Sequence, residues 1–294
     1  MAIRFQPLHP MIGAMAEGAD LSQPLAPAQL KEIVAGMDRY AVLVFRGQKL
    51  DEDQQIAYAK QFGPLDLGLR KIRKGQPHRF KYDELADISN VKVDGSVAER
   101  DSAKILNNIA NQLWHSDSSF QKPAARYSML HAVAIPAKGG ETEFADLRAA
   151  YDALPGDLKK DIDGLEAEHH ALHSRIMMGD TGYSEEQKRA IPPAVWPLVR
   201  THAGSGRKLL FVGIHATRVL GMTVPEGRML LMDLMEHATQ REFVYRHVWR
   251  VGDLVMWDNR AVLHRGRRFD LSERREMRRA TTEDVEEISA RDAA

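Results

Sequence analysis

Three residues of this 294-residue chain, His115, Asp117 and His264, are of the types that bind a transition metal. Two imidazoles and one carboxylate are the ligand set that holds non-haem Fe(II) on one face and leaves the opposite positions open. His115 and Asp117 are two residues apart, so on an extended strand both side chains point to the same side and can bind one ion. His264 has to reach them from a distant part of the fold. The spacing therefore predicts an iron site with positions free for small ligands.

Two arginines, Arg275 and Arg279, follow His264 in the sequence. Because they are four residues apart, they share a face on a strand, and the apolar Met277 between them favours the inward face. Two fixed cations beside an open-sided iron fit two anionic ligands, since a guanidinium pairs with a carboxylate through two hydrogen bonds. The alternative is a solvated basic strand. The opposite face carries Arg274, Glu276 and Arg278.

A His-x-Asp pair alone is weak evidence, because such pairs also occur in turns and on surface strands. The surroundings favour the metal site over that structural alternative. His264 lies in an apolar strand, where an imidazole without a partner would be costly. Asp117 lies among serines beside Trp114, and not in a run of surface acids.

Composition limits the class of protein. Hydrophobic residues make up 44% and charged residues 28% of the chain, which is ordinary for a globular enzyme. A formal net charge of +0 predicts no nucleic acid and no acidic membrane as partner. The absence of cysteine excludes disulfides and thiolate metal sites. With no apolar run near the roughly 18 residues of a membrane span and no stretch typical of a signal peptide, we expect a cytoplasmic protein.

The elements that must position these residues are mainly short strands separated by turn signals. This pattern favours a β-sandwich or jelly-roll barrel with peripheral helices, in one domain over residues 1–294. The predicted strands are 41–45, 127–135, 141–144, 198–202, 209–212, 243–251, 254–257, 261–265 and 276–281. The predicted helices are 51–62, 146–154, 156–165 and 225–238.

Two stretches lack this periodicity. Residues 67–111 predict a long excursion of loops and small elements, of the kind that covers an active site, and 179–193 predicts a second loop. In the helix at 225–238, the methionines are expected to serve packing. They are Met229, Met232 and Met235.

At this point the chain resembles a known family. The pattern His115-x-Asp117, His264 and the following arginines is similar to the TauD/TfdA group of Fe(II)- and 2-oxoglutarate-dependent dioxygenases, whose fold is a double-stranded β-helix. The resemblance covers nearly the whole chain and is closest to the 2,4-dichlorophenoxyacetate, or aryloxyalkanoate, dioxygenases. The stretches that carry it are 42–47, 84–91, 111–120 and 255–260.

The resemblance implies a role for each matching position. His115, Asp117 and His264 correspond to the iron ligands. Thr142 and Arg275 correspond to the pair that holds the distal carboxylate of 2-oxoglutarate. Arg279 corresponds to the residue that binds the substrate carboxylate.

Other candidates are weaker. Lys71 resembles a family lysine that contacts the substrate carboxylate, but it lies in the basic stretch 70–74, where a solvated loop is the alternative and any of several cations could take the role. Lys92 is a further candidate. His202 and His215 fall near where the family lines its pocket, although core or rim positions explain them equally well.

The resemblance also implies a reaction. With Fe(II), 2-oxoglutarate and O2, such an enzyme hydroxylates the carbon next to the ether oxygen of an aryloxyacetate, giving a phenol, glyoxylate, succinate and CO2. Alternatives are the same chemistry on a sulfonate, a sulfate ester or a natural aryl carboxylic acid, or a non-catalytic metal-binding jelly roll. A homo-oligomer is expected from the resemblance alone.

Overall fold

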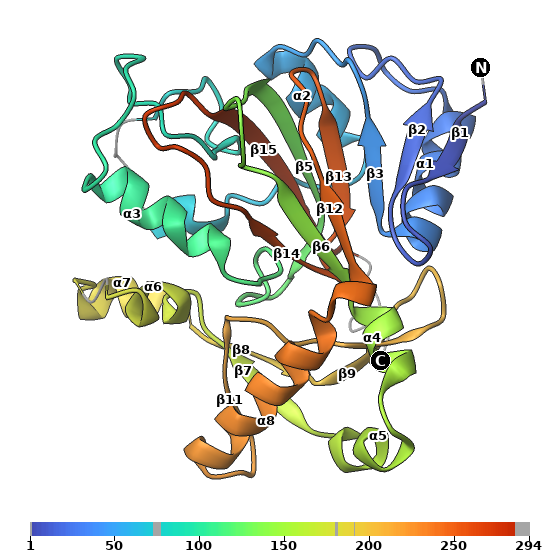
Figure 1. Cartoon of the computed structure of the whole chain (residues 1–294), viewed down its shortest axis with the longest axis vertical. Coiled ribbons are helices and arrows are strands. Elements are labelled where there is room, and N and C mark those ends of the chain that lie inside the picture. The colour runs from blue at the N-terminus through green and yellow to red at the C-terminus, as the bar shows by residue number, and fades with distance from the viewer. Residues whose placement is uncertain (1, 73–77, 180–181, 191, 286–294) are drawn as a thin grey trace.

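The computed structural model describes residues 2–72, 78–179, 182–190 and 192–285, and it is built mainly of strands with helices around them (Figure 1). The largest sheet has seven strands. Strands β2 and β3 pair in parallel, and the other neighbours are antiparallel. Across the sheet, the order is β1 (Arg4–Pro7), β2 (Ala14–Glu17), β3 (Val42–Phe45), β13 (Leu254–Asp258), β5 (Ala125–Ala134), β15 (Glu276–Glu283) and β4 (Ala86–Asp87).

A second, three-stranded sheet packs on the large sheet and carries His264. Phe144 and Val262 from this sheet share one buried cluster with Val255 and Trp257 of β13. Burying each such side chain contributes about 1.5–3 kcal/mol, so the two sheets hold each other in place around the site. In order, the strands of the second sheet are β12 (Val244–His247), β6 (Thr142–Asp146) and β14 (Val262–Gly266).

Strand β13 is apolar over its first four positions, Leu254–Trp257, because both of its faces are buried. Val255 and Trp257 face the second sheet, whereas Leu254 and Met256 pack in another cluster with Ile33 on the opposite face. A strand buried on both faces needs apolar side chains throughout. The helices on that opposite face are α1 (Pro27–Tyr40) and α2 (Glu52–Lys60).

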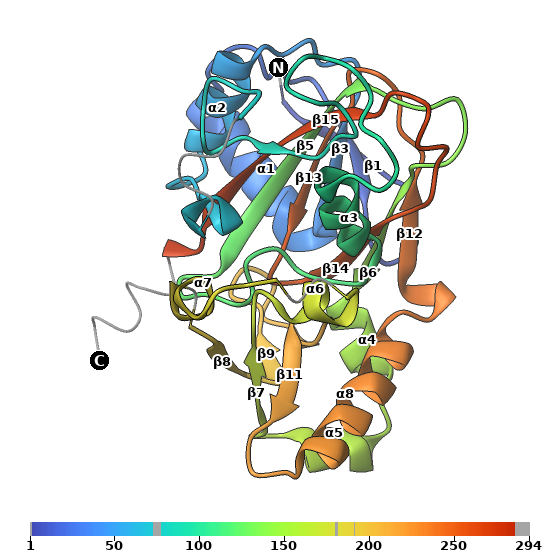
Figure 2. The same cartoon turned by 90° about the vertical axis from the view of Figure 1, so that its left-hand side faces the viewer.

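The lower part of Figures 1 and 2 holds two smaller sheets and further helices. Helix α8 (Val224–Ala238) packs beside β11 (Ala216–Val219). The other strands there are β7 (Glu166–His169), β8 (Ala194–Pro197), β9 (Val199–Thr201) and β10 (Lys208–Leu210). The other helices are α4 (Leu147–Ala153), α5 (Gly156–Ile162), α6 (His173–Met177) and α7 (Glu185–Ala190).

The excursion 67–111 is largely irregular, as predicted. Its described parts contain the short helices η1 (Gly68–Ile72) and α3 (Ala103–Ile109), and η2 (Ala110–Gln112) follows at its end. Two parts of the sequence prediction need correction here. The stretch 179–193 contains α7 and is not only a loop. The N-terminal 40 residues, for which no element was predicted, form β1, β2 and α1.

The prediction that the α8 methionines serve packing is wrong for two of the three. Met229 and Met232 are 56% and 59% exposed, while Met235 packs against the core. The buried stripe of this helix is taken by Leu231, Leu234 and Ala238. Within the described residues, no helix combines the length and the apolar character that crossing a membrane would require.

Candidate functional site

The two predicted histidines meet as neighbouring backbone segments. His264 lies on β14, and a short antiparallel bridge joins it to His115 through His115 N–H to His264 O (3.1 Å) and His264 N–H to His115 O (2.8 Å). Asp117 is not on a strand, which corrects the sequence prediction. The chain turns after the bridge, and Ser118 has a φ of 48°. The turn, rather than strand alternation, brings the carboxylate back to the imidazoles.

The donor atoms of His115, Asp117 and His264 all lie within 4.8 Å of one another, and the three side chains are buried. His115 Nε2 lies 3.8 Å from Asp117 Oδ1, and His264 Nε2 lies 3.7 Å from Asp117 Oδ2. His115 Nδ1 lies 2.7 Å from the carbonyl of Leu113, which can only accept a hydrogen bond. Nδ1 therefore carries the proton, and the Nε2 lone pair faces the other ligands.

Neighbouring polar groups orient the carboxylate. Ser128 Oγ donates to Asp117 Oδ2 (2.7 Å), and the Asn259 side chain donates to Ser128 Oγ (2.9 Å). The Asn259 side-chain carbonyl also accepts from the backbone N–H of Asp117 (3.0 Å) and from the Trp257 indole (3.0 Å). This chain of hydrogen bonds holds Asp117 in one orientation, as outer partners of metal ligands do.

The protonation states suit a divalent metal. Burial opposes ionisation of Asp117, but nearby positive charge, that of the Arg279 guanidinium first, outweighs it and lowers the pKa of the carboxyl to about 2. Burial lowers the pKa of both His115 and His264, so both imidazoles are neutral at pH 7. Two neutral imidazoles and one carboxylate are the form in which these residues bind metal, so the donor set fits Fe(II).

Two cavities open beside this cluster, and His115 and Arg279 line both. The smaller cavity, of about 750 Å³ including its open mouth, contains Thr142, Trp257, His264 and Arg275 in its wall. The larger cavity, of about 2290 Å³ including its open mouth, contains Asp117. It lies between α3 and the pair α6 and α7, which stand on the same side of the sheets in Figure 1. The cluster can therefore be approached by two ligands at once.

Arg275 presents a buried cation to the smaller cavity. Burial lowers the pKa of its guanidinium to about 10, and no anion offsets that effect among the residues described. An unpaired buried charge is unfavourable, so this position suits an anionic ligand. Gly140 approaches so closely that a Cβ there would lie 3.3 Å from Arg275 Nε. The turn at Gly139-Gly140 thus lets the chain pass the guanidinium and brings Thr142 into the same wall.

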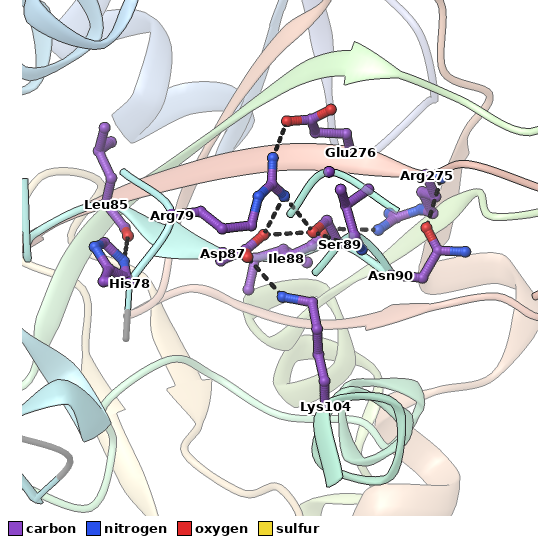
Figure 3. A network of polar contacts seen from close by, with 12 residues as sticks. His78, Arg79, Leu85, Asp87, Ile88, Ser89, Asn90, Lys104, Arg275 and Glu276 are labelled. Carbon is purple, nitrogen blue, oxygen red and sulfur yellow. Dashed lines mark hydrogen bonds and ion pairs between the residues drawn. The ribbon is translucent and has the colours of Figure 1, made fainter. Parts of the chain in front are cut away.

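The excursion forms part of this wall, and Figure 3 shows how it holds Arg275. The Asn90 side-chain carbonyl accepts from the backbone N–H of Arg275 (2.8 Å), and the Ile88 carbonyl accepts from Arg275 Nη1 (3.2 Å). The Asn90 amide donates to the carbonyls of Leu271 (2.9 Å) and Glu273 (2.7 Å). Asn90 therefore joins the excursion to the link that leads into β15.

Ion pairs brace this junction (Figure 3). Arg79 pairs with Asp87 and with Glu276 of β15, and Lys104 of α3 pairs with Asp87 (2.6 Å). All four side chains are at least half-buried. The segment 87–90 is thus held by β15 and by α3. This part of the excursion therefore forms a fixed portion of the cavity wall.

The other predicted site residues lie in different places. Arg279 Nη1 donates to Asp117 Oδ1 (2.6 Å), so this arginine reaches the cluster. The Lys71 ammonium contacts Asp66 (3.3 Å) and is 41% exposed, and the structure does not bring it into the wall of either cavity. Arg70 and Lys92 line the larger cavity. Arg73 and Lys74 lie outside the described residues.

His202 and His215, for which the sequence left both core and pocket positions open, lie in different surroundings. His202 is held between Asp258 (3.0 Å) and Ser205 (2.9 Å), as expected for a core residue. His215 lines the larger cavity, with its ring 6.1 Å from that of His115 and 5.0 Å from that of Phe120.

Sequence reasoning missed Asn90, although it falls in one of the stretches of resemblance, because an asparagine in a loop carries no chemical signal of its own.

Residues 4–281 match the family described as Taurine catabolism dioxygenase TauD, TfdA family. The chain belongs to this family. It is 64% identical to the alpha-ketoglutarate-dependent 2,4-dichlorophenoxyacetate dioxygenase of Cupriavidus pinatubonensis, over 97% of this chain and 99% of the relative. It is 37% identical to the (S)-phenoxypropionate/alpha-ketoglutarate-dioxygenase of Sphingobium herbicidovorans, over 94% and 93%.

Among solved structures, AAD-2 in complex with Mn(II) and N-oxalylglycine is similar with a TM-score of 0.92 and 45% sequence identity. The match covers 96% of this chain and 98% of that chain. These findings confirm the family predicted from the sequence and identify the chain as an oxidoreductase, a dioxygenase of the alpha-ketoglutarate-dependent kind.

Proposed function

We propose that this protein uses Fe(II) and 2-oxoglutarate to hydroxylate aryloxyacetates such as 2,4-dichlorophenoxyacetate at the carbon next to the ether oxygen. The observation that carries the proposal is a buried two-histidine, one-carboxylate cluster between two cavities, with an arginine at each. Relatives at 64% and 62% identity that are named for this substrate support it.

The residues divide into three roles. His115, Asp117 and His264 would hold the iron, and Arg275 with Thr142 would hold the distal carboxylate of 2-oxoglutarate in the smaller cavity. When bound, iron and 2-oxoglutarate together with O2 supply the oxidising equivalents for attack on a C–H bond, with release of succinate and CO2. The chain itself binds and orients these groups.

Arg279 would bind the substrate carboxylate. Its guanidinium lies at the cluster and lines the larger cavity, so a carboxylate paired with it brings the adjacent methylene to the iron site. Selectivity then follows from position, because the C–H bond held nearest reacts. Hydroxylation of that carbon gives a hemiacetal, which breaks into a phenol and glyoxylate without a protein acid or base.

The larger cavity offers an apolar wall for the aromatic ring. Phe120 packs with Leu69 there, and Ile214 lines the same cavity. Apolar and aromatic side chains with a few fixed polar groups are typical of small-molecule sites. Arg70 and Lys92 of the same wall are paired with Asp83 and Glu99, so at the cluster the anchor would be Arg279, which suits an anionic head group in general. A sulfonate or a sulfate ester is therefore the alternative substrate class.

Succinate release distinguishes these substrates. We expect kcat/KM to be highest for aryloxyacetates in a panel that also contains taurine, alkyl sulfates and cinnamates. A clear preference for a sulfate or a sulfonate would change the proposed substrate class but leave the proposed reaction type unchanged. No release with any of the acids would contradict the proposed function.

Replacing Arg275 by alanine should raise the KM for 2-oxoglutarate about ten- to a hundred-fold. The lost bond is charge-assisted, and such bonds contribute about 1.5–3 kcal/mol net. The KM for the aryloxy acid should change much less. Steady-state kinetics with each substrate varied in turn will measure both values. The reverse pattern would mean that Arg275 and Arg279 have exchanged roles.

Replacing Asn90 by alanine should raise the KM for 2-oxoglutarate about three- to ten-fold, because Arg275 loses the neutral hydrogen bond that fixes its backbone. Asp94→Ala is the matched control. Asp94 stabilises a turn in the same excursion through Ser96, so its loss loosens the loop without touching Arg275. If the two variants raised the KM for 2-oxoglutarate equally, Asn90 would contribute only to the stability of the loop and would not position Arg275 specifically.

We also infer that the two facing sheets form the jelly roll of the family within one domain, which the shared core cluster between them supports. O2 as co-substrate is part of the proposed chemistry. The homo-oligomer and the cytoplasmic location stay predictions.

A further inference from the structure

Thr142 has a neighbour that the proposed chemistry does not use. Thr142 begins β6, where it pairs with His247 of β12 on one side and with Gly266 of β14 on the other. The chain leaves β12 after His247, and the buried Trp249 donates its indole N–H to Thr142 Oγ1 (3.0 Å). Thr142 is thus contacted from its own sheet and from the irregular segment that follows β12.

The indole is held firmly. Its ring packs edge-on against the ring of His247, with centroids 4.5 Å apart and planes at 86°. His247 Nε2 lies 3.1 Å from the carboxylate of Asp253, which fixes the histidine in turn. Both residues are fully buried. The indole N–H therefore points at the Thr142 hydroxyl from a fixed position.

The direction of this hydrogen bond determines where the hydroxyl proton lies. An indole nitrogen can only donate, so Thr142 Oγ1 must accept. The threonine proton is then directed away from the indole. Thr142 also lines the smaller cavity, as does the guanidinium of Arg275.

We propose that Trp249 is a positioning residue for 2-oxoglutarate, which aims the hydroxyl proton of Thr142 into the smaller cavity. The inference rests on the proposed function, because the acceptor is the distal carboxylate that Arg275 would hold. A hydroxyl that already accepts one hydrogen bond is also polarised and donates a stronger one. Fixing the donor before the ligand arrives lowers the cost of ordering it on binding.

A double-mutant cycle tests the inference through the affinity of Mn(II)-loaded protein for N-oxalylglycine, measured by calorimetry. We expect about ten-fold weaker binding in Thr142→Val and about three- to ten-fold weaker binding in Trp249→Phe. The double variant should bind no more weakly than Thr142→Val alone. Tyr58→Phe is the control for loss of a buried aromatic donor, because that hydroxyl donates to Met256 Sδ on the opposite face of the large sheet, and it should leave the affinity unchanged.

The outcomes separate the inference from the function on which it rests. Normal affinity in Thr142→Val would contradict the proposed 2-oxoglutarate site itself. Normal affinity in Trp249→Phe, beside a weakened Thr142→Val, would overturn only the role of Trp249. Trp249→Phe could also weaken binding as much in the Thr142→Val background as in the unmodified protein. That result would overturn the role of Trp249, because its effect would then not pass through the Thr142 hydroxyl.

A second measurement covers the case in which Trp249→Phe does not fold. The chain has four tryptophans, so nitrogen-15 labelling gives four indole N–H signals that Trp→Phe variants at the other three positions assign by elimination. In Zn(II)-loaded protein, Thr142→Val should move the Trp249 signal to higher field. N-oxalylglycine should move it to lower field in the unmodified protein and leave it unmoved in Thr142→Val. An indole signal that ignores both changes would overturn the inference.

Discussion

Replacing Asp117 by alanine should abolish succinate release and weaken iron binding, while the fold persists. Asp117 is the one carboxylate in the buried cluster, and its two oxygens face His115 and His264. Two imidazoles alone leave an incomplete ligand set with weaker hold on the metal. Iron titration and circular dichroism will report the two effects separately.

Asp163→Ala is the matched control for Asp117. Asp163 is an exposed carboxylate that pairs with Lys208 far from the cluster, and its loss should leave iron binding and turnover unchanged. Strong chelators should stop the unmodified enzyme, and Co(II), Ni(II) or Zn(II) should inhibit it, since affinity alone does not select iron. Turnover that survives either the chelator or Asp117→Ala would show that the cluster is not the metal site.

Replacing Arg279 by alanine should uncouple the two half-reactions. If Arg279 anchors the substrate carboxylate, its loss leaves no C–H bond well placed, so 2-oxoglutarate is consumed without productive hydroxylation. Succinate should then exceed phenol at saturating substrate, and the KM for the aryloxy acid should rise about ten- to a hundred-fold. The measurement is the ratio of succinate to phenol. A ratio that stays near one would assign the anchoring to another residue of the larger cavity, with Lys92 and Arg175 the first to test.

Altered substrates provide the control for Arg279. The guanidinium also donates to Asp117, so Arg279→Ala disturbs a proposed metal ligand as well as the proposed anchor. An amide or methyl ester of the aryloxyacetate leaves the protein intact and removes only the charge that Arg279 would pair with. We expect that change to cost far more in kcat/KM than the loss of a ring chlorine, which removes apolar contact of about 1 kcal/mol. Equal costs would argue against carboxylate anchoring.

The chemistry-bearing residues and most central strands could be predicted from the sequence, because their signals are local. Strand β13 is apolar over 254–257 because both its faces are buried there. Met277 lies in the core cluster, as the alternation predicted, although Glu276 and Arg278 of the opposite face are buried too. The ligand types at His115, Asp117 and His264 predicted a cluster that the structure brings together.

Other features depend on tertiary contacts that leave no periodic pattern. Asp117 reaches the imidazoles through a turn with a positive φ at Ser118, and not through strand alternation. The predicted strand 243–251 ends at His247, and the irregular segment beyond it places Trp249 against Thr142. Lys71 had a family counterpart, yet Asp66 and Gln121 hold its ammonium. Such partners are distant in sequence, so composition and spacing could not reveal them.

The most direct test of the central claim is the product balance with 2,4-dichlorophenoxyacetate under Fe(II), 2-oxoglutarate and O2. The proposed positioning predicts phenol, glyoxylate and succinate in equal amounts, with no turnover when any one of the three additions is withheld. Hydroxylation of the ring, or succinate formed with no phenol in the unmodified enzyme, would contradict it.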